Sequence, residues 1–146
     1  MDSKVVLKDG MAFEGHLDGF QFMIDAAAKV GGQGLGPKPK GLVLTALVGC
    51  TAMDVISILR KMRVEVDGFE VEADASVAEE HPQTFTEITV TYRFEGTDLP
   101  EARLRRAIEL SEDKYCGVSA MLRASASLRH QIVVNGEVLA EPANTA

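Results

Sequence analysis

Two cysteines, Cys50 and Cys116, are the side chains of this 146-residue chain best suited to covalent chemistry. A thiolate is a nucleophile, and two thiols that meet can form a reversible disulfide. The chain has no C-x-x-C motif, and its histidines, His16, His81 and His130, are scattered. This spacing is not that of zinc ligands and predicts neither a metal site nor a cofactor. The pair is then either two structural thiols or a redox couple.

Cys50 lies in an apolar stretch, residues 41–59, whose one formal charge is Asp54. A membrane span needs about twenty apolar residues and tolerates a central charge badly, so the stretch predicts a core helix rather than a span. A helix that is apolar nearly all round must be covered on every side, which predicts an oligomer. On periodicity alone Cys50 is best explained as a core thiol, since free cysteine packs as a small hydrophobe.

The N-terminal third reads as short strands and a loop. Strands are expected at residues 4–8, 11–16 and 20–25. The last is predicted to be half-buried because Phe20, Phe22 and Ile24 alternate with Gln21, Met23 and Asp25. Asp-Gly pairs between these strands indicate hairpin turns. The glycine-rich residues 31–41 predict a loop. They resemble a phosphate loop only superficially, because Leu42 stands where such a loop needs lysine.

The rest of the chain predicts strands at residues 64–76, 85–94 and 126–134 and a second helix after residue 98. Asp98 is expected to cap that helix, with Glu101 as its return partner. Gly117 is expected to interrupt it. The residues predicted to face inward alternate along the second of these strands and recur at helical spacing: Ile88, Val90, Tyr92, Phe94, Leu104, Ala107, Ile108 and Ser111.

The order of elements predicts an α+β fold in one domain, residues 1–140, with a frayed tail at residues 141–146. The net charge is −7, and no basic run appears. Nucleic acid and anionic membranes both require clustered Lys and Arg, so neither is an expected partner. The N-terminus lacks the apolar segment of a secretory signal, and we expect a cytoplasmic protein with reduced cysteines.

Three short motifs together resemble the OsmC/Ohr family, and within it the YhfA-like OsmC-like protein subgroup. They are G-P-x-P at residues 36–39, C-x-x-M at residues 50–53 on the long apolar helix, and Y-C-x-V-S at residues 115–119. The resemblance covers about residues 29–134 and implies an intertwined homodimer, with curved antiparallel sheets wrapped around long central helices.

The resemblance also implies a function, a cysteine-based peroxidase that reduces organic hydroperoxides in oxidative-stress defence. In that case Cys50 attacks the peroxide, Cys116 closes a disulfide with the resulting sulfenic acid, and a small thiol or dithiol reductant reopens it. No cofactor is implied.

The chain departs from the family pattern at the charges that prepare the thiolate. Peroxidases of the family place an N-terminal arginine beside the reactive cysteine and pair it with a glutamate nine positions before that cysteine. Here no arginine precedes Arg60, and the glutamate position is Gly41. Three later arginines are the candidates to replace it: Arg93, Arg123 and Arg129. The departure favours an alternative function, an OsmC-fold binding protein for a hydrophobic small molecule with little or no peroxidase turnover.

Three other residues have open roles. Met53 fits either the lining of a substrate site or core packing. Asp54 follows Cys50 by one helical turn and fits either a residue that orients a polar neighbour or a structural cap or salt bridge. His130 lies in the inward phase of the last strand, where a satisfied, half-buried histidine is the simpler interpretation.

Overall fold

The structure is a computed structural model that describes residues 1–140, and it forms two compact units, residues 1–45 and the part from residue 46 onward. Each unit has its own sheet. The single domain expected over residues 1–140 stays a prediction. The predicted tail, residues 141–146, lies outside the described residues.

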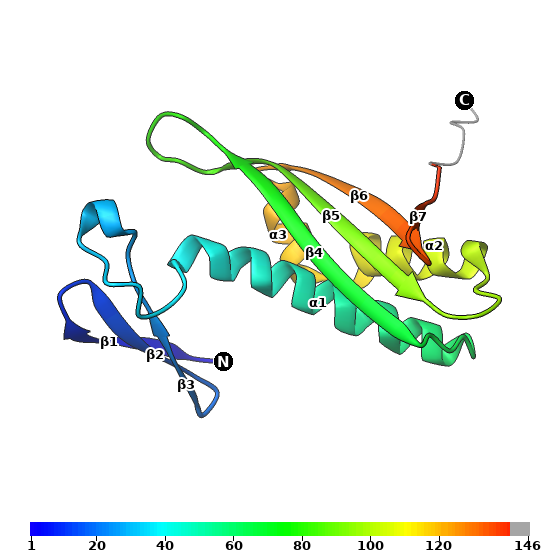
Figure 1. Cartoon of the computed structure of the whole chain (residues 1–146), viewed down its shortest axis with the longest axis horizontal. Coiled ribbons are helices and arrows are strands. Elements are labelled where there is room, and N and C mark those ends of the chain that lie inside the picture. Colours follow the sequence, from blue (N-terminus) through cyan, green and yellow to red (C-terminus); the bar gives the residue numbers. More distant parts are fainter. Residues whose placement is uncertain (141–146) are drawn as a thin grey trace. The chain divides into compact units, whose positions relative to one another are not determined.

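The first unit is a three-stranded antiparallel sheet in the order β1-β2-β3 (Figure 1). Its strands are β1 (Ser3–Asp9), β2 (Ala12–Leu17) and β3 (Phe20–Ile24). The two predicted Asp-Gly turns are confirmed, and Gly10 and Gly19 both have positive φ, where glycine is unstrained. The half-buried face predicted for β3 is wrong for two of its side chains. Phe20 is 77% exposed and Phe22 is 37% exposed in this chain.

One buried carboxylate organises the loop that follows β3. Asp25 is 2% exposed and accepts backbone N–H bonds from Ala26 at 2.7 Å, Gln33 at 2.7 Å and Leu35 at 3.2 Å. These bonds, that of Gln33 foremost, lower the pKa of the Asp25 carboxyl. The short 3₁₀ turn η1 (Ala28–Val30) lies between these donors. The sequence placed Asp25 on the polar side of a strand and gave no sign of this role.

The long helix α1 (Pro39–Lys61) buries only one stripe of its surface inside this chain. The buried residues are Leu47, Thr51, Val55, Ile58 and Leu59. By length and composition α1 could cross a membrane, a test that core helices of soluble proteins also pass, and 28% of its apolar window is buried. Met53 is 75% exposed, so packing in the core of this chain does not explain it. An apolar helix surface is left for other groups to cover.

The second unit has a four-stranded sheet in the order β4-β5-β6-β7. Its strands are β4 (Gly68–Val77), β5 (Phe85–Glu95), β6 (Ser127–Val134) and β7 (Glu137–Val138). The first and last pairs are antiparallel, but β5 and β6 are parallel, with Glu87 opposite Ser127 and Phe94 opposite Val134. The sheet is therefore mixed, which differs from the antiparallel sheets that the resemblance implied.

A helical crossover joins the parallel strands β5 and β6, as parallel pairing requires (Figure 1). It consists of α2 (Glu101–Leu110), the π-helical turn η2 (Ser111–Tyr115) and α3 (Gly117–Arg123). The predicted cap is wrong: Pro100 occupies the N-cap position without a side-chain cap bond, and Asp98 has φ 51. The break falls at Cys116, whose backbone is extended, and Gly117 begins α3.

The core of the second unit lies between the sheet and the helices. The inward faces predicted for β5 and α2 are confirmed: Ile88, Val90, Tyr92, Phe94, Leu104, Ala107, Ile108 and Ser111 are all at most 2% exposed. Tyr92 of β5 hydrogen-bonds both Thr51 of α1 and Glu112 of η2. Both helical segments therefore cover the same face of the sheet. The α+β class predicted from the order of elements is confirmed.

Candidate active site

The fold brings the two cysteines together, although 65 residues separate them in the sequence. The sulfur atoms of Cys50 and Cys116 and a carboxylate oxygen of Asp54 all lie within 4.8 Å of one another. Both cysteines are free thiols, Cys50 half-buried and Cys116 buried. Cys50 and Asp54 share one side of α1 because they are one helical turn apart. The sequence predicted that shared side correctly.

The irregular end of the crossover positions Cys116. Its backbone N–H donates to the Ser111 carbonyl at 2.7 Å, which closes the π-helical turn. Its own sulfur accepts the Ser119 N–H at 3.3 Å and so caps α3. The Val118 N–H donates to the sulfur of Cys50. Backbone donors that a helix start leaves without intrahelical partners are thus directed at both sulfurs. Single π turns often occur at functional sites.

The environment of Cys50 opposes ionisation. Burial raises the pKa of the Cys50 thiol most, and Cys116 and the Asp54 carboxylate raise it further, whereas the Val118 N–H lowers it. None of these groups is a cation. This direction is the one expected where the charge pair that prepares the thiolate in peroxidases of the family is missing from its usual places.

The three arginines considered as replacements form ion pairs elsewhere in the described part of the chain. Arg93 pairs with Glu70 and Glu72 of β4. Arg129 pairs with Glu87 at 3.6 Å. Arg123 pairs with Glu112 and Asp113, both at 3.6 Å, and also donates to the Glu112 carbonyl at 3.2 Å. Within residues 1–140, none of these ion pairs involves Cys50, and no arginine is among the groups that shift its pKa.

A chain of buried hydrogen bonds starts at Asp54 and leads away from the sulfurs. Ser111 Oγ donates to Asp54 Oδ2 at 3.1 Å, and the Ser111 and Thr51 hydroxyls are 2.8 Å apart. Thr51 Oγ1 lies 2.8 Å from the Tyr92 hydroxyl, which donates to Glu112 Oε1 at 3.3 Å. Within residues 1–140 no buried side-chain nitrogen or oxygen lacks a partner. This series of hydrogen bonds fixes the carboxylate of Asp54 beside the two thiols.

The far end of this hydrogen-bond chain reaches the surface at His130. Its Nδ1 lies 3.1 Å from Glu112 Oε2, and its ring packs edge-on against Tyr92. The interpretation of His130 as a half-buried, satisfied histidine is confirmed. The sequence did not reveal Glu112 as the residue that joins Tyr92, His130 and Arg123, because its partners come from three separate elements.

A hollow of about 290 Å³ adjoins Asp54. Its other lining residues are Ser57, Ile58, Lys61, Met62, Leu110 and Tyr115. The walls are largely apolar, with Asp54 and Lys61 as charged groups. The hollow is just below the usual size range of small-ligand pockets, and it opens beside the one cluster of reactive side chains described above.

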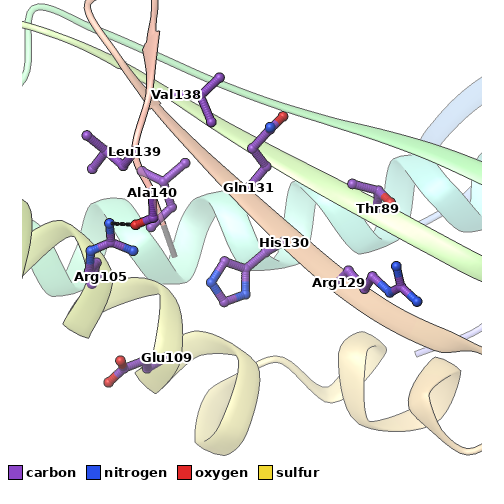
Figure 2. Close-up of a pocket in the computed structure, with 10 residues that line it drawn as sticks. Thr89, Arg105, Glu109, Arg129, His130, Gln131, Val138, Leu139 and Ala140 are labelled. Atoms are coloured by element: carbon purple, nitrogen blue, oxygen red, sulfur yellow. Dashed lines mark hydrogen bonds between the residues drawn. The ribbon is translucent and has the colours of Figure 1, made fainter. Parts of the chain in front are cut away.

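A larger hollow of about 670 Å³ lies between α2, β6 and β7, away from the cysteines (Figure 2). Figure 2 shows Arg105, Glu109 and His130 among the residues that line it, and Arg105 donates to the Ala140 carbonyl at 2.6 Å. Neither cysteine nor Asp54 lines it. It has charged side chains but no thiol, and for that reason we place the candidate active site at the cysteines.

The fold and the paired thiols match a known class of protein. The family model described as OsmC-like protein matches residues 32–131, which include both cysteines and Asp54. The chain belongs to the OsmC-like protein family. The family resemblance inferred from the motifs is confirmed.

Individual relatives support the same assignment. Protein YhfA of Escherichia coli strain K12 is 37% identical over 136 residues, which are 92% of this chain and 98% of that protein. A hypothetical protein from Aquifex aeolicus VF5 has a solved structure with TM-score 0.82 and 27% identity, covering 92% of this chain and 95% of that one. The organic hydroperoxide resistance protein OhrB of Bacillus subtilis shares the fold, with TM-score 0.61, 20% identity and coverage of 92% and 98%.

Proposed function

We propose that the protein is a thiol-dependent peroxidase that reduces organic hydroperoxides in oxidative-stress defence. The observation that carries the proposal is the approach of Cys50 and Cys116, whose sulfurs lie within 4.8 Å as free thiols. A disulfide has sulfurs about 2.05 Å apart, so the two side chains must bring these sulfurs closer by about 2.8 Å at most. Family membership and structural neighbours named as organic hydroperoxide resistance proteins support the same proposal.

The proposed cycle has three balanced steps. The Cys50 thiolate attacks the outer peroxide oxygen, the O–O bond breaks, and the thiol and hydroperoxide become a sulfenic acid and an alcohol. The Cys116 thiol then displaces water from the sulfenic acid, which forms the Cys50–Cys116 disulfide. Two equivalents of a small thiol, or one dithiol, reduce this disulfide to two thiols and are themselves oxidised to a disulfide. No cofactor takes part.

The residues around the thiols have separate roles in this cycle. The Val118 N–H donates to the Cys50 sulfur and stabilises the thiolate. The hollow beside Asp54, with Ile58, Met62 and Leu110 in its walls, accepts the apolar tail of the hydroperoxide. This placement favours bulky organic hydroperoxides over hydrogen peroxide.

The raised pKa of Cys50 supports a second candidate function, a binding protein for a hydrophobic small molecule with little turnover. An unassisted thiol is only a few per cent ionised at neutral pH, and the chain supplies Asp54 where a peroxidase needs a cation. In that case the hollow beside Asp54 holds the ligand and the thiols are secondary.

We further propose that the protein is a cytoplasmic homodimer that binds neither nucleic acid nor membranes. The exposed apolar surface of α1, with Met53 75% exposed and Val43 38% exposed, supports a second copy as its cover. The composition supports the absence of nucleic-acid and membrane partners, since an acidic chain of net charge −7 without a basic run repels anionic surfaces.

The test is steady-state consumption of cumene hydroperoxide with dithiothreitol as the reductant. We expect turnover by the wild type, a lower rate with hydrogen peroxide, and no turnover by Cys50→Ser. Cys116→Ser is expected to lose rate because no disulfide forms within the chain. If the wild type consumes no hydroperoxide but binds a fluorescent fatty-acid probe, the second candidate function replaces the first.

A further inference from the structure

The two sulfurs and the carboxylate of Asp54 form a cluster with the composition of a cation site. All three ligand atoms lie within 4.8 Å of one another. A tetrahedral zinc ion with bonds of about 2.3 Å to sulfur and about 2.1 Å to oxygen holds its ligand atoms roughly 3.5–3.8 Å apart. The cluster therefore needs a contraction of about 1 Å or less, which side-chain rotation supplies. Spacing along the chain could not reveal it, because Cys116 joins the other two only through the fold.

We propose that Cys50, Cys116 and Asp54 form a binding site for a divalent cation of the zinc class when both thiols are reduced. Thiolate ligands select borderline-soft ions such as Zn²⁺ over Mg²⁺ or Ca²⁺. Binding converts two thiols to thiolates and so releases two protons, and with the carboxylate it places three negative charges around the ion. Three protein ligands leave the fourth tetrahedral position open for water.

The surroundings of the cluster fit this role. The groups that shift the pKa of Cys50 are Cys116, Val118 and Asp54, and none of them is a cation. Ser111 Oγ donates to Asp54 Oδ2 at 3.1 Å and is itself held by Thr51 at 2.8 Å. Metal-bound carboxylates are typically oriented by such outer hydrogen bonds. The Ser119 N–H does the same for the sulfur of Cys116.

Cation binding and the proposed redox cycle exclude each other, since a Cys50–Cys116 disulfide removes two of the three ligands. The site does not depend on peroxidase turnover. A dithiol that binds zinc need not reduce peroxides, and a peroxidase need not bind a metal ion.

The test uses the reduced full-length protein and Co²⁺, which reports thiolate ligands through a charge-transfer band in the near ultraviolet. Zn²⁺ affinity is measured by competition with a chromophoric chelator. We expect one ion per chain, a thiolate–cobalt band that Zn²⁺ abolishes, and loss of binding in Cys50→Ser and Cys116→Ser. Asp54→Asn keeps an oxygen for Ser111 but loses the charge, and it should weaken binding at least about tenfold. Asp113→Asn, a change at a 75% exposed carboxylate nearby in sequence, should leave the affinity unchanged.

Oxidation of the wild type with diamide tests the proposed cation site without any substitution. We expect the oxidised protein to lose both the cobalt band and zinc binding, and to regain them on reduction. Equal zinc affinity in the oxidised and reduced forms, or absence of the thiolate–cobalt band, would overturn the proposal. Equal affinity in wild type and folded Asp54→Asn would also overturn it, since the site would then be a dithiol without the carboxylate. None of these readouts involves peroxide, so failure here is distinguishable from failure of the proposed function.

Discussion

Replacement of Asp54 by asparagine is expected to lower the pKa of the Cys50 thiol. The carboxylate oxygen lies within 4.8 Å of the sulfur and disfavours the thiolate. Coulomb's law at that distance gives roughly 0.9 kcal/mol with the dielectric constant of water and roughly 3.5 kcal/mol with an effective value of 20. Because Cys50 is half-buried, we expect the free-energy effect to lie between these two limits and the pKa of the Cys50 thiol to fall.

The assay is the pH dependence of iodoacetamide alkylation in a Cys116→Ser background, which leaves Cys50 as the only thiol. A metal chelator is present so that no metal ion binds that thiol. A free-energy effect of about 1.4 kcal/mol, within that range, gives about tenfold more thiolate, but a less basic thiolate is a weaker nucleophile, with a Brønsted slope of about 0.4–0.5. The net rate at neutral pH should therefore rise about three- to fourfold. Asparagine preserves an acceptor for Ser111, so the effect isolates the charge.

Asp113→Asn in the same background is the matched control, because its carboxylate is 75% exposed and pairs with Arg123. We expect its alkylation profile to match that of the parent. A midpoint that is unchanged or higher in Asp54→Asn would show that the Asp54 charge does not oppose ionisation of Cys50. Slower alkylation at neutral pH would mean that Asp54 promotes ionisation of Cys50.

The remaining predictions concern assembly and stability. Sedimentation at micromolar concentration should give twice the 15.7 kDa chain mass, and a compact, stable monomer would refute the dimer. Thr51→Val leaves the buried hydroxyls of Tyr92 and Ser111 without that partner and should cost about 2–4 kcal/mol in urea unfolding, whereas Thr45→Val on the exposed side of α1 should cost far less. Asp25→Asn should reduce stability at neutral pH. Since the folded-state pKa of Asp25 is lowered, its contribution is present above the unfolded value of about 4 and is lost as pH falls toward the lower folded value. The wild-type and Asp25→Asn stabilities should then converge in acid, and a constant difference between pH 7 and pH 3 would contradict this account.

Local patterns in the sequence predicted the regular elements well. The alternation of Ile88, Val90, Tyr92 and Phe94 identified the buried face of β5, because a strand that covers a core repeats every two residues. The spacing of Leu104, Ala107 and Ile108 did the same for α2. Asp-Gly pairs predicted both turns of the first sheet, because glycine adopts positive φ there without strain.

Features that depend on distant parts of the chain were not predictable in this way. The Asp98 cap was wrong because Asp98 adopts a left-handed conformation in the turn before Pro100. The parallel pairing of β5 with β6 has no local signal. Asp25 resembles an ordinary polar strand residue, and its partners lie one to ten positions later in a glycine-rich loop.

In the candidate site, too, local features were predictable from the sequence and long-range contacts were not. Cys50 and Asp54 could be placed on one side of a helix, because one helix holds both. The break at Cys116 depends on a π-helical turn that no residue pattern announced. The hydrogen-bond chain through Thr51, Tyr92 and Glu112 joins three elements, and only the folded chain reveals it.

The most direct test of the proposed peroxidase is a titration of the reduced protein with a single equivalent of cumene hydroperoxide, followed by thiol counting and a non-reducing peptide map. The proposed peroxidase cycle predicts that each chain loses both thiols per hydroperoxide consumed and yields one peptide pair linked through Cys50 and Cys116, with an equal amount of alcohol. Free thiols that persist, or a Cys50 that oxidises beyond the sulfenic acid without a link to Cys116, would contradict it.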